Sequence, residues 1–173
     1  MKFKETLTYD DILLVPQYSD IESRKEIDIG NDLDDSLHLD LPVISAPMDT
    51  VTENTMAIAM HQAGGLGIIH RYNSIEEQAN MIAATITTTF DRIVGAAIGV
   101  TGDFEERACA LYDAGASIIC IDVAHGHHIL VERAIKTLRD VLGTNVHIMA
   151  GNIATPEGYE ALSRWGADSI RCN

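Results

Sequence analysis

Short apolar runs alternate with helix-like segments along most of this 173-residue chain. After residue 40 the runs lie at 42–45, 66–70, 93–99, 117–122, 145–150 and 168–171, and a polar or amphipathic stretch separates each from the next. Continuous apolar runs of this length are typical of parallel strands that are buried on both faces. The alternation therefore restricts the fold to the α/β class, either as a doubly wound open sheet or as a (β/α)8 barrel.

The repeat length favours the barrel. Successive units begin about 25 residues apart, a spacing that suits the strand and helix of a barrel unit. The first strand-to-helix junction, 45-SAPMDTVTE-53, lacks the G-x-G-x-x-G pattern of dinucleotide-binding sheets. We predict a (β/α)8 TIM barrel, of which residues 41–173 supply about six strands.

Residues 1–40 differ from the rest of the chain because they are polar, acidic and irregular. We expect an N-terminal extension that packs across one end of the barrel, with residues 33–40 as a solvated loop. Within the barrel, Ser74 and Glu77 form an S-x-x-E capping box. Thr155 precedes a proline that suits the first helical position, and Thr52 is predicted to cap the first helix.

The composition excludes several functional classes. The formal net charge is −14, with 26 acidic and 12 basic residues, which argues against a nucleic-acid-binding surface. No signal-peptide core is present, and no run reaches the roughly 18 apolar residues of a membrane span. Three cysteines, Cys109, Cys120 and Cys172, match no disulfide or zinc spacing. We therefore expect a cytoplasmic protein with neither nucleic acid nor membrane as a partner.

The candidate functional residues follow the predicted strands, because the carboxyl ends of parallel strands carry the chemistry. These positions bring to one mouth Met48, Asp49, His70, Asp122, His125, His127 and Asn152. The histidines at 125–128 lack a carboxylate at ligand spacing, so no metal site is predicted. From residue type alone, His70 also suits a structural hydrogen-bonded role, and Asp49 also suits an acid at a helix N-terminus.

Five motifs in fixed order resemble the catalytic barrel of the IMP dehydrogenase/GMP reductase family: YDDILLVP, SAPMDTVTE, GGLGIIHRYNSIEEQA, DVAHGH and AGNIAT. The resemblance runs from about Leu7 to Asn173, and MDTVTE, IEEQA and DVAHGH are closer to the dehydrogenases than to the reductases. It implies NAD-dependent oxidation of IMP to XMP in guanine nucleotide synthesis. In that chemistry a cysteine thiolate adds to C2 of the purine, and water then releases the product.

The resemblance also implies roles for residues at matching positions. Cofactor-binding positions are Asp122, Val123, Ala124 and Gly126, where glycine allows close backbone approach. Substrate-binding positions are Ala46, Met48, Asn152 and Arg171.

The family nucleophile lies on a G-x-G-S-x-C loop that also binds phosphate and potassium. By the motif order this loop would follow Asn173, and Cys172 lies several residues too early to be the nucleophile. We therefore predict no catalytic residue in this chain and expect it to be inactive alone, while a complete enzyme would use potassium. Only residues 81–92 occupy the place where most members carry paired CBS modules, so we expect a form without CBS modules.

The resemblance further implies a homotetramer, or completion of the barrel by a second polypeptide. Two other functions stay open. The short segment 81–92 motivates a GMP reductase, which converts GMP to IMP with NADPH. The missing nucleophile motivates a non-catalytic subunit that binds nucleotide or serves assembly.

Overall fold

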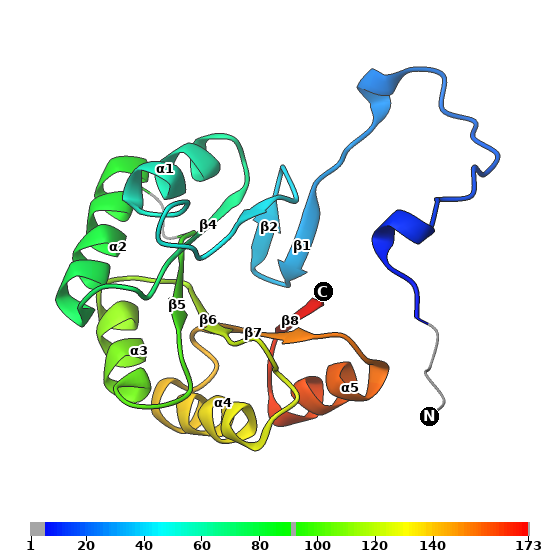
Figure 1. Ribbon diagram of the computed structural model, residues 1–173. Helices are drawn as coiled ribbons and strands as arrows, with labels where there is room; N and C mark the ends of the chain where they lie inside the picture. Colours follow the sequence, from blue (N-terminus) through cyan, green and yellow to red (C-terminus); the bar gives the residue numbers. More distant parts are fainter. Residues whose placement is uncertain (1–5, 91–92, 173) are drawn as a thin grey trace, which may run out of the picture.

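Six parallel strands form one curled sheet in the computed structural model, which describes residues 6–90 and 93–172 (Figure 1). The strands are β3 (Ile44–Ser45), β4 (Leu66–Ile69), β5 (Gly95–Ile98), β6 (Ile118–Asp122), β7 (His147–Ile153) and β8 (Ser169–Cys172). Their order in the sheet is their order in the chain. This arrangement confirms the α/β class and the partial TIM barrel. Asn173 and the last two residues of the predicted bridging segment 81–92 lie outside the described residues.

Five helices cover the convex side of the sheet (Figure 1). They are α1 (Asn54–Gln62), α2 (Ile75–Thr89), α3 (Phe104–Asp113), α4 (Ile129–Leu142) and α5 (Pro156–Trp165). Two predicted first turns are confirmed. Ser74 and Glu77 form the capping box of α2, and Thr155 Oγ1 accepts a hydrogen bond from the backbone N–H of Gly158 in α5.

The predicted cap of the first helix is wrong. Glu53, not Thr52, occupies the N-cap position of α1, and it makes no side-chain capping bond. Thr52 is fully buried, and its hydroxyl lies 2.6 Å from the carbonyl oxygen of Ala46 and 2.9 Å from Ser45 Oγ. The hydroxyl therefore holds the loop that follows β3 rather than the helix that follows the loop.

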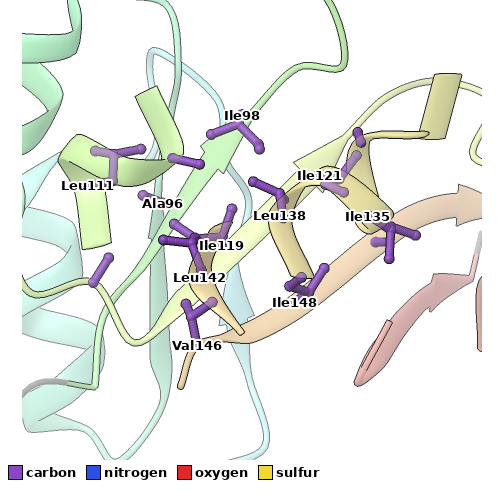
Figure 2. Close-up of a cluster of buried hydrophobic side chains, with 14 of the residues drawn as sticks. Ala96, Ile98, Leu111, Ile119, Ile121, Ile135, Leu138, Leu142, Val146 and Ile148 are labelled. Carbon is purple, nitrogen blue, oxygen red and sulfur yellow. The ribbon is translucent and has the colours of Figure 1, made fainter. Parts of the chain in front are cut away.

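The outer face of the sheet forms the larger core (Figure 2). Ile119 and Ile121 alternate along β6 and are fully buried, and they belong to one cluster with Ile135 and Leu138 of α4. Figure 2 shows Leu111 of α3 and Ile98 of β5 in the same layer. Each such side chain stabilises the fold by about 1.5–3 kcal/mol when it leaves water. The sheet is thus held against its helices by side chains of period two on the strands.

The inner face of the sheet forms a second apolar cluster, which a β-hairpin closes at the amino-terminal ends of the strands. The hairpin consists of β1 (Asn31–Asp34) and β2 (Leu37–Leu39), paired antiparallel. Leu37 and Leu39 are 8% and 3% exposed and pack with sheet residues Leu66, Ile68, Ala97, Ile118, Cys120 and Met149. The interpretation of residues 33–40 as a solvated loop is therefore wrong. Two leucines spaced by two residues put one apolar edge of the hairpin into the barrel interior.

Residues 6–30 lie mostly in extended backbone, with two short 3-10 turns, η1 (Tyr9–Asp11) and η2 (Arg24–Glu26). Several of their apolar side chains face solvent, with Leu13 95% and Leu14 98% exposed. In Figure 1 this segment runs away from the sheet. Among the described residues, no helix is both long and apolar enough to cross a membrane.

Candidate active site

The alternation of β6 and β8 brings two charged side chains together at the mouth of the barrel. Ile118 and Cys120 of β6 face the interior, so Asp122 is the next inward residue at the carboxyl end. Arg171 of β8 and Asp122 of β6 both pair with Gly151 of the strand between them. A Cβ at Gly151 would lie 2.7 Å from Arg171 Cβ. The glycine thus leaves the space in which Arg171 and Asp122 form their ion pair.

The ion pair fixes the charges at this end of the sheet. The pKa of Arg171 is raised although burial alone would lower it, because the Asp122 carboxylate lies beside it, so the guanidinium keeps its proton. Arg171 Nη1 also lies 3.8 Å from Cys120 Sγ. Burial raises the pKa of Cys120 to about 12, and its side chain is fully buried. Cys120 is therefore a neutral thiol below the pair, while the pair itself reaches the mouth.

A cavity of about 320 Å³ opens over this ion pair. It is lined by Ala46, Pro47, Met48, Asp49, Tyr72, Asp122 and Arg171. Four of these residues, 46–49, come from the loop after β3 that Thr52 holds in place. The structure thus brings together five of the residues singled out from the sequence, namely Ala46, Met48, Asp49, Asp122 and Arg171. A volume near 300 Å³ is the lower range for small-molecule sites.

Tyr72 is a cavity residue that the sequence reasoning did not single out. Its side chain is 61% exposed and lies in the loop between β4 and α2. His70, which the sequence analysis placed at the mouth of the barrel, is buried beside Tyr72 and is only 3% exposed. His70 Nδ1 accepts a hydrogen bond from the backbone N–H of Tyr72, and its Nε2 lies 3.5 Å from Glu53 Oε1. Tyr72 could have been identified from the sequence, because it is an aromatic residue in the polar segment that follows a predicted strand.

The loop after β6 carries the predicted cofactor residues. Val123 donates its N–H to the Gly151 carbonyl and packs against the outer core, whereas Ala124 is exposed. Gly126 is buried and donates its N–H to the Asn152 carbonyl at 2.6 Å. A Cβ at Gly126 would lie 2.9 Å from that carbonyl oxygen. The absence of a side chain at Gly126 therefore lets the loop after β6 come close to the backbone of β7.

The remaining predicted residues do not line the cavity. His125 and His127 are exposed, and His127 contacts Trp165 with ring centroids 5.8 Å apart. His128 caps α4, since its Nδ1 accepts the Leu130 N–H. Asn152 is half-buried beside Gly126. Within residues 6–90 and 93–172, no group of three or more histidine, cysteine or acidic side chains is arranged to hold a metal ion.

Buried polar atoms without a partner gather after the strands. In the part of the chain that the structure describes, these atoms belong to His70, Arg71, Asn73 and Asn152. All four residues lie at or directly after the carboxyl ends of β4 and β7. Buried polar groups in folded proteins almost always have partners, so a bound water or ligand can satisfy those of Asn73 and Asn152, whereas His70 Nε2 lies 3.5 Å from Glu53 Oε1.

Comparison with known proteins agrees with this geometry. The family described as IMP dehydrogenase / GMP reductase domain matches residues 6–173. An IMP dehydrogenase of Cryptosporidium parvum is 33% identical over 95% of this chain and 50% of its own length. An IMP dehydrogenase of Nitrosopumilus maritimus is 29% identical over 99% of this chain and 61% of its own length.

Relatives with the other family name match as well. A GMP reductase of Leishmania major is 26% identical over 96% of this chain and 61% of its own length. The chain thus spans half to three fifths of the curated relatives it matches. Because the family match covers nearly every residue, this chain belongs to the IMP dehydrogenase/GMP reductase family.

Proposed function

We propose that this chain binds IMP and NAD at the mouth of the barrel and serves the oxidation of IMP to XMP. The observation that carries the proposal is the cavity over the Asp122–Arg171 pair. It combines an apolar wall, from Ala46 and Met48, with two carboxylates and one guanidinium. A purine nucleotide has the matching parts, which are a planar base, ribose hydroxyls and a phosphate.

We assign the binding of IMP to Met48 in the cavity wall, to Arg171 and to Asn152. Met48 is 52% exposed in the cavity, so its flexible thioether can pack against a purine ring. Arg171 brings a guanidinium to the same cavity, where it can donate hydrogen bonds to oxygen atoms of a nucleotide. The contact of Asn152 with the substrate stays a prediction, because its Oδ1 has no hydrogen-bond partner among the described residues but is buried outside the cavity lining.

The cofactor side is assigned to Asp122 and the loop that follows it. The Asp122 side chain is 22% exposed, so part of its carboxylate remains free to accept hydrogen bonds from ribose hydroxyls. Ala124 is exposed beside it and leaves room for a flat ring. NAD, when bound, supplies the acceptor for the hydride. The loop residues thus suit NAD, and their proposed task is to hold and orient it.

The thiolate role is assigned to neither Cys109 nor Cys120. Cys120 is fully buried, and burial raises its pKa to about 12, so it is not a nucleophile at neutral pH. Burial together with Glu105 and Asp113 raises the pKa of Cys109, which lies in α3 away from the mouth. No step is assigned to potassium either, because the described residues hold no glycine loop of the kind expected to bind it.

Equilibrium binding tests this proposal directly. Titration calorimetry of the purified protein with IMP and with NAD should give dissociation constants between about 1 µM and 1 mM, the usual range for metabolic enzymes. NADH formation on mixing IMP with NAD would extend the result from binding to turnover. The proposal would be refuted if IMP or NAD failed to bind at roughly millimolar concentration. Native mass spectrometry of the same sample would test the proposed homotetramer.

A GMP reductase is the second candidate, and the Leishmania relatives of that name favour it. The two functions differ in substrate and in the direction of hydride transfer. Oxidation of NADPH that depends on GMP, without NADH formation from IMP and NAD, would favour the reductase.

A further inference from the structure

The Tyr72 ring lies at the cavity that holds the Asp122–Arg171 pair, and its exposure needs an explanation. A tyrosine side chain that is 61% exposed leaves a large apolar ring in water. The ring belongs to the cavity lining, together with Ala46 and Met48. It is therefore an aromatic surface at the mouth of the barrel, in a cavity large enough for a small ligand.

The ring is held in place by its two preceding residues. The His70 ring is stacked on it, with centroids 6.2 Å apart and planes inclined by 27°. The Arg71 guanidinium carbon lies 5.2 Å from the Tyr72 ring centroid, a cation–π distance. His70 also fixes the backbone by accepting the Tyr72 N–H at 3.1 Å. Because the ring is already ordered, a ligand that stacks on it loses little free energy in fixing it.

The loop that carries Tyr72 is anchored from the helices below. Arg107 of α3 is 8% exposed and donates a hydrogen bond to the Asn73 carbonyl at 3.2 Å. It also donates to Gln78 Oε1 at 2.9 Å. Gln78 in turn donates to the carbonyl of Ile69, the last residue of β4. Both ends of the short loop are thus tied to buried side chains.

We propose that Tyr72 is the stacking surface for the purine base, and this proposal rests on the proposed nucleotide-binding function. Stacking on an aromatic ring recognises a flat heteroaromatic base and is insensitive to the sugar and the phosphate. The charged pair offers hydrogen bonds and charge but no aromatic surface. Tyr72 then determines that the occupant carries a base, while Arg171 acts on the rest of the nucleotide.

The test compares IMP with ribose 5-phosphate, which lacks the base. Titration calorimetry should show that Tyr72→Ala weakens IMP binding by about tenfold, the usual size of a base–aromatic contact. The same variant should bind ribose 5-phosphate as the wild type does, and Tyr72→Phe should keep the IMP affinity. Tyr159→Ala is the matched control, because Tyr159 is 53% exposed on α5 and lies outside the cavity.

Each contrary result has a distinct meaning. Equal IMP affinity in Tyr72→Ala and wild type would overturn the stacking role and leave the nucleotide site intact. Equal loss of affinity for IMP and ribose 5-phosphate would show a distorted loop instead of a lost stacking contact, and would also overturn the role. Nicotinamide mononucleotide, titrated in the same way, serves as the probe for the cofactor. A loss of affinity confined to this probe would assign Tyr72 to the cofactor and overturn the purine assignment. A wild type that binds no IMP would overturn the proposed function together with this one.

Discussion

The two ends of the same six strands differ in how completely their polar groups are paired. At the amino-terminal end, the β1–β2 hairpin covers the interior, and Asp34, His147 and Ser169 form one chain of hydrogen bonds. At the carboxyl-terminal end a cavity opens, and buried polar atoms of Asn73 and Asn152 lack hydrogen-bond partners within the described residues. The comparison teaches that one end of this sheet serves stability and the other is left free to bind.

The largest expected effect comes from breaking the closed end. Leu39→Ala should lower the free energy of unfolding by about 2–4 kcal/mol, because Leu39 is 3% exposed and its loss leaves a cavity in the inner cluster. Urea unfolding followed by circular dichroism measures this change. Leu14→Ala is the control, since Leu14 is 98% exposed and should change stability by less than about 0.5 kcal/mol.

The comparison would fail if both leucine variants were equally stable, since the hairpin would then contribute nothing to the fold. It would also weaken if Leu39→Ala lost nucleotide affinity at a temperature where it remains folded, because the two ends would then be coupled.

A change at the open end should affect binding and spare stability. Asp122→Asn keeps an acceptor for Arg171 but removes the charge that we assign to the cofactor ribose. NAD affinity should fall by roughly 10- to 100-fold, the usual loss for a hydrogen bond to a charged group. The urea midpoint should stay close to that of the wild type. A large loss of stability with unchanged NAD affinity would make Asp122 a structural residue.

A smaller effect is expected from acid, again at the closed end. Partial burial opposes ionisation of Asp34, but hydrogen bonds from His147 and Ser36 outweigh it and lower the pKa of Asp34 from 3.8 to about 2. Because the folded-state pKa lies below the unfolded one, the ionised group stabilises the fold fully above about pH 4. This contribution is lost as the pH falls toward 2 and amounts to about 1–2 kcal/mol, since Asp34 is 29% exposed.

Urea unfolding of Asp34→Asn and wild type at several pH values checks this expectation. The variant should be less stable than the wild type at neutral pH, and the difference should shrink through the window below pH 4. Asp35→Asn is the matched control, because Asp35 is exposed in the same turn. A stability difference that persists unchanged at the acid end would show that the charge of Asp34 is not its cause.

Local sequence patterns were sufficient to predict the strands and most helix starts. Ser74 and Glu77 are three residues apart and satisfy each other, so their capping box depends on nothing distant. The apolar runs identified all six parallel strands, and the four central strands β4–β7 are buried at nearly every position, which requires mostly apolar residues on both faces. Thr52 shows the limit of such patterns, because its hydroxyl donates a hydrogen bond to the Ala46 carbonyl in the loop after β3 and does not cap the helix.

The sequence by itself determined the repeating α/β order, the family and the pairing of site residues with strand ends. Only the tertiary structure decided that residues 31–39 form a hairpin, that Asp122 meets Arg171 over Gly151, and that Tyr72 faces the cavity. In the hairpin, Leu37 and Leu39 stand among acidic residues, so their local composition resembles a solvated loop. Their burial depends on the inner face of a sheet whose strands follow much later in the chain, and no local pattern contains that information.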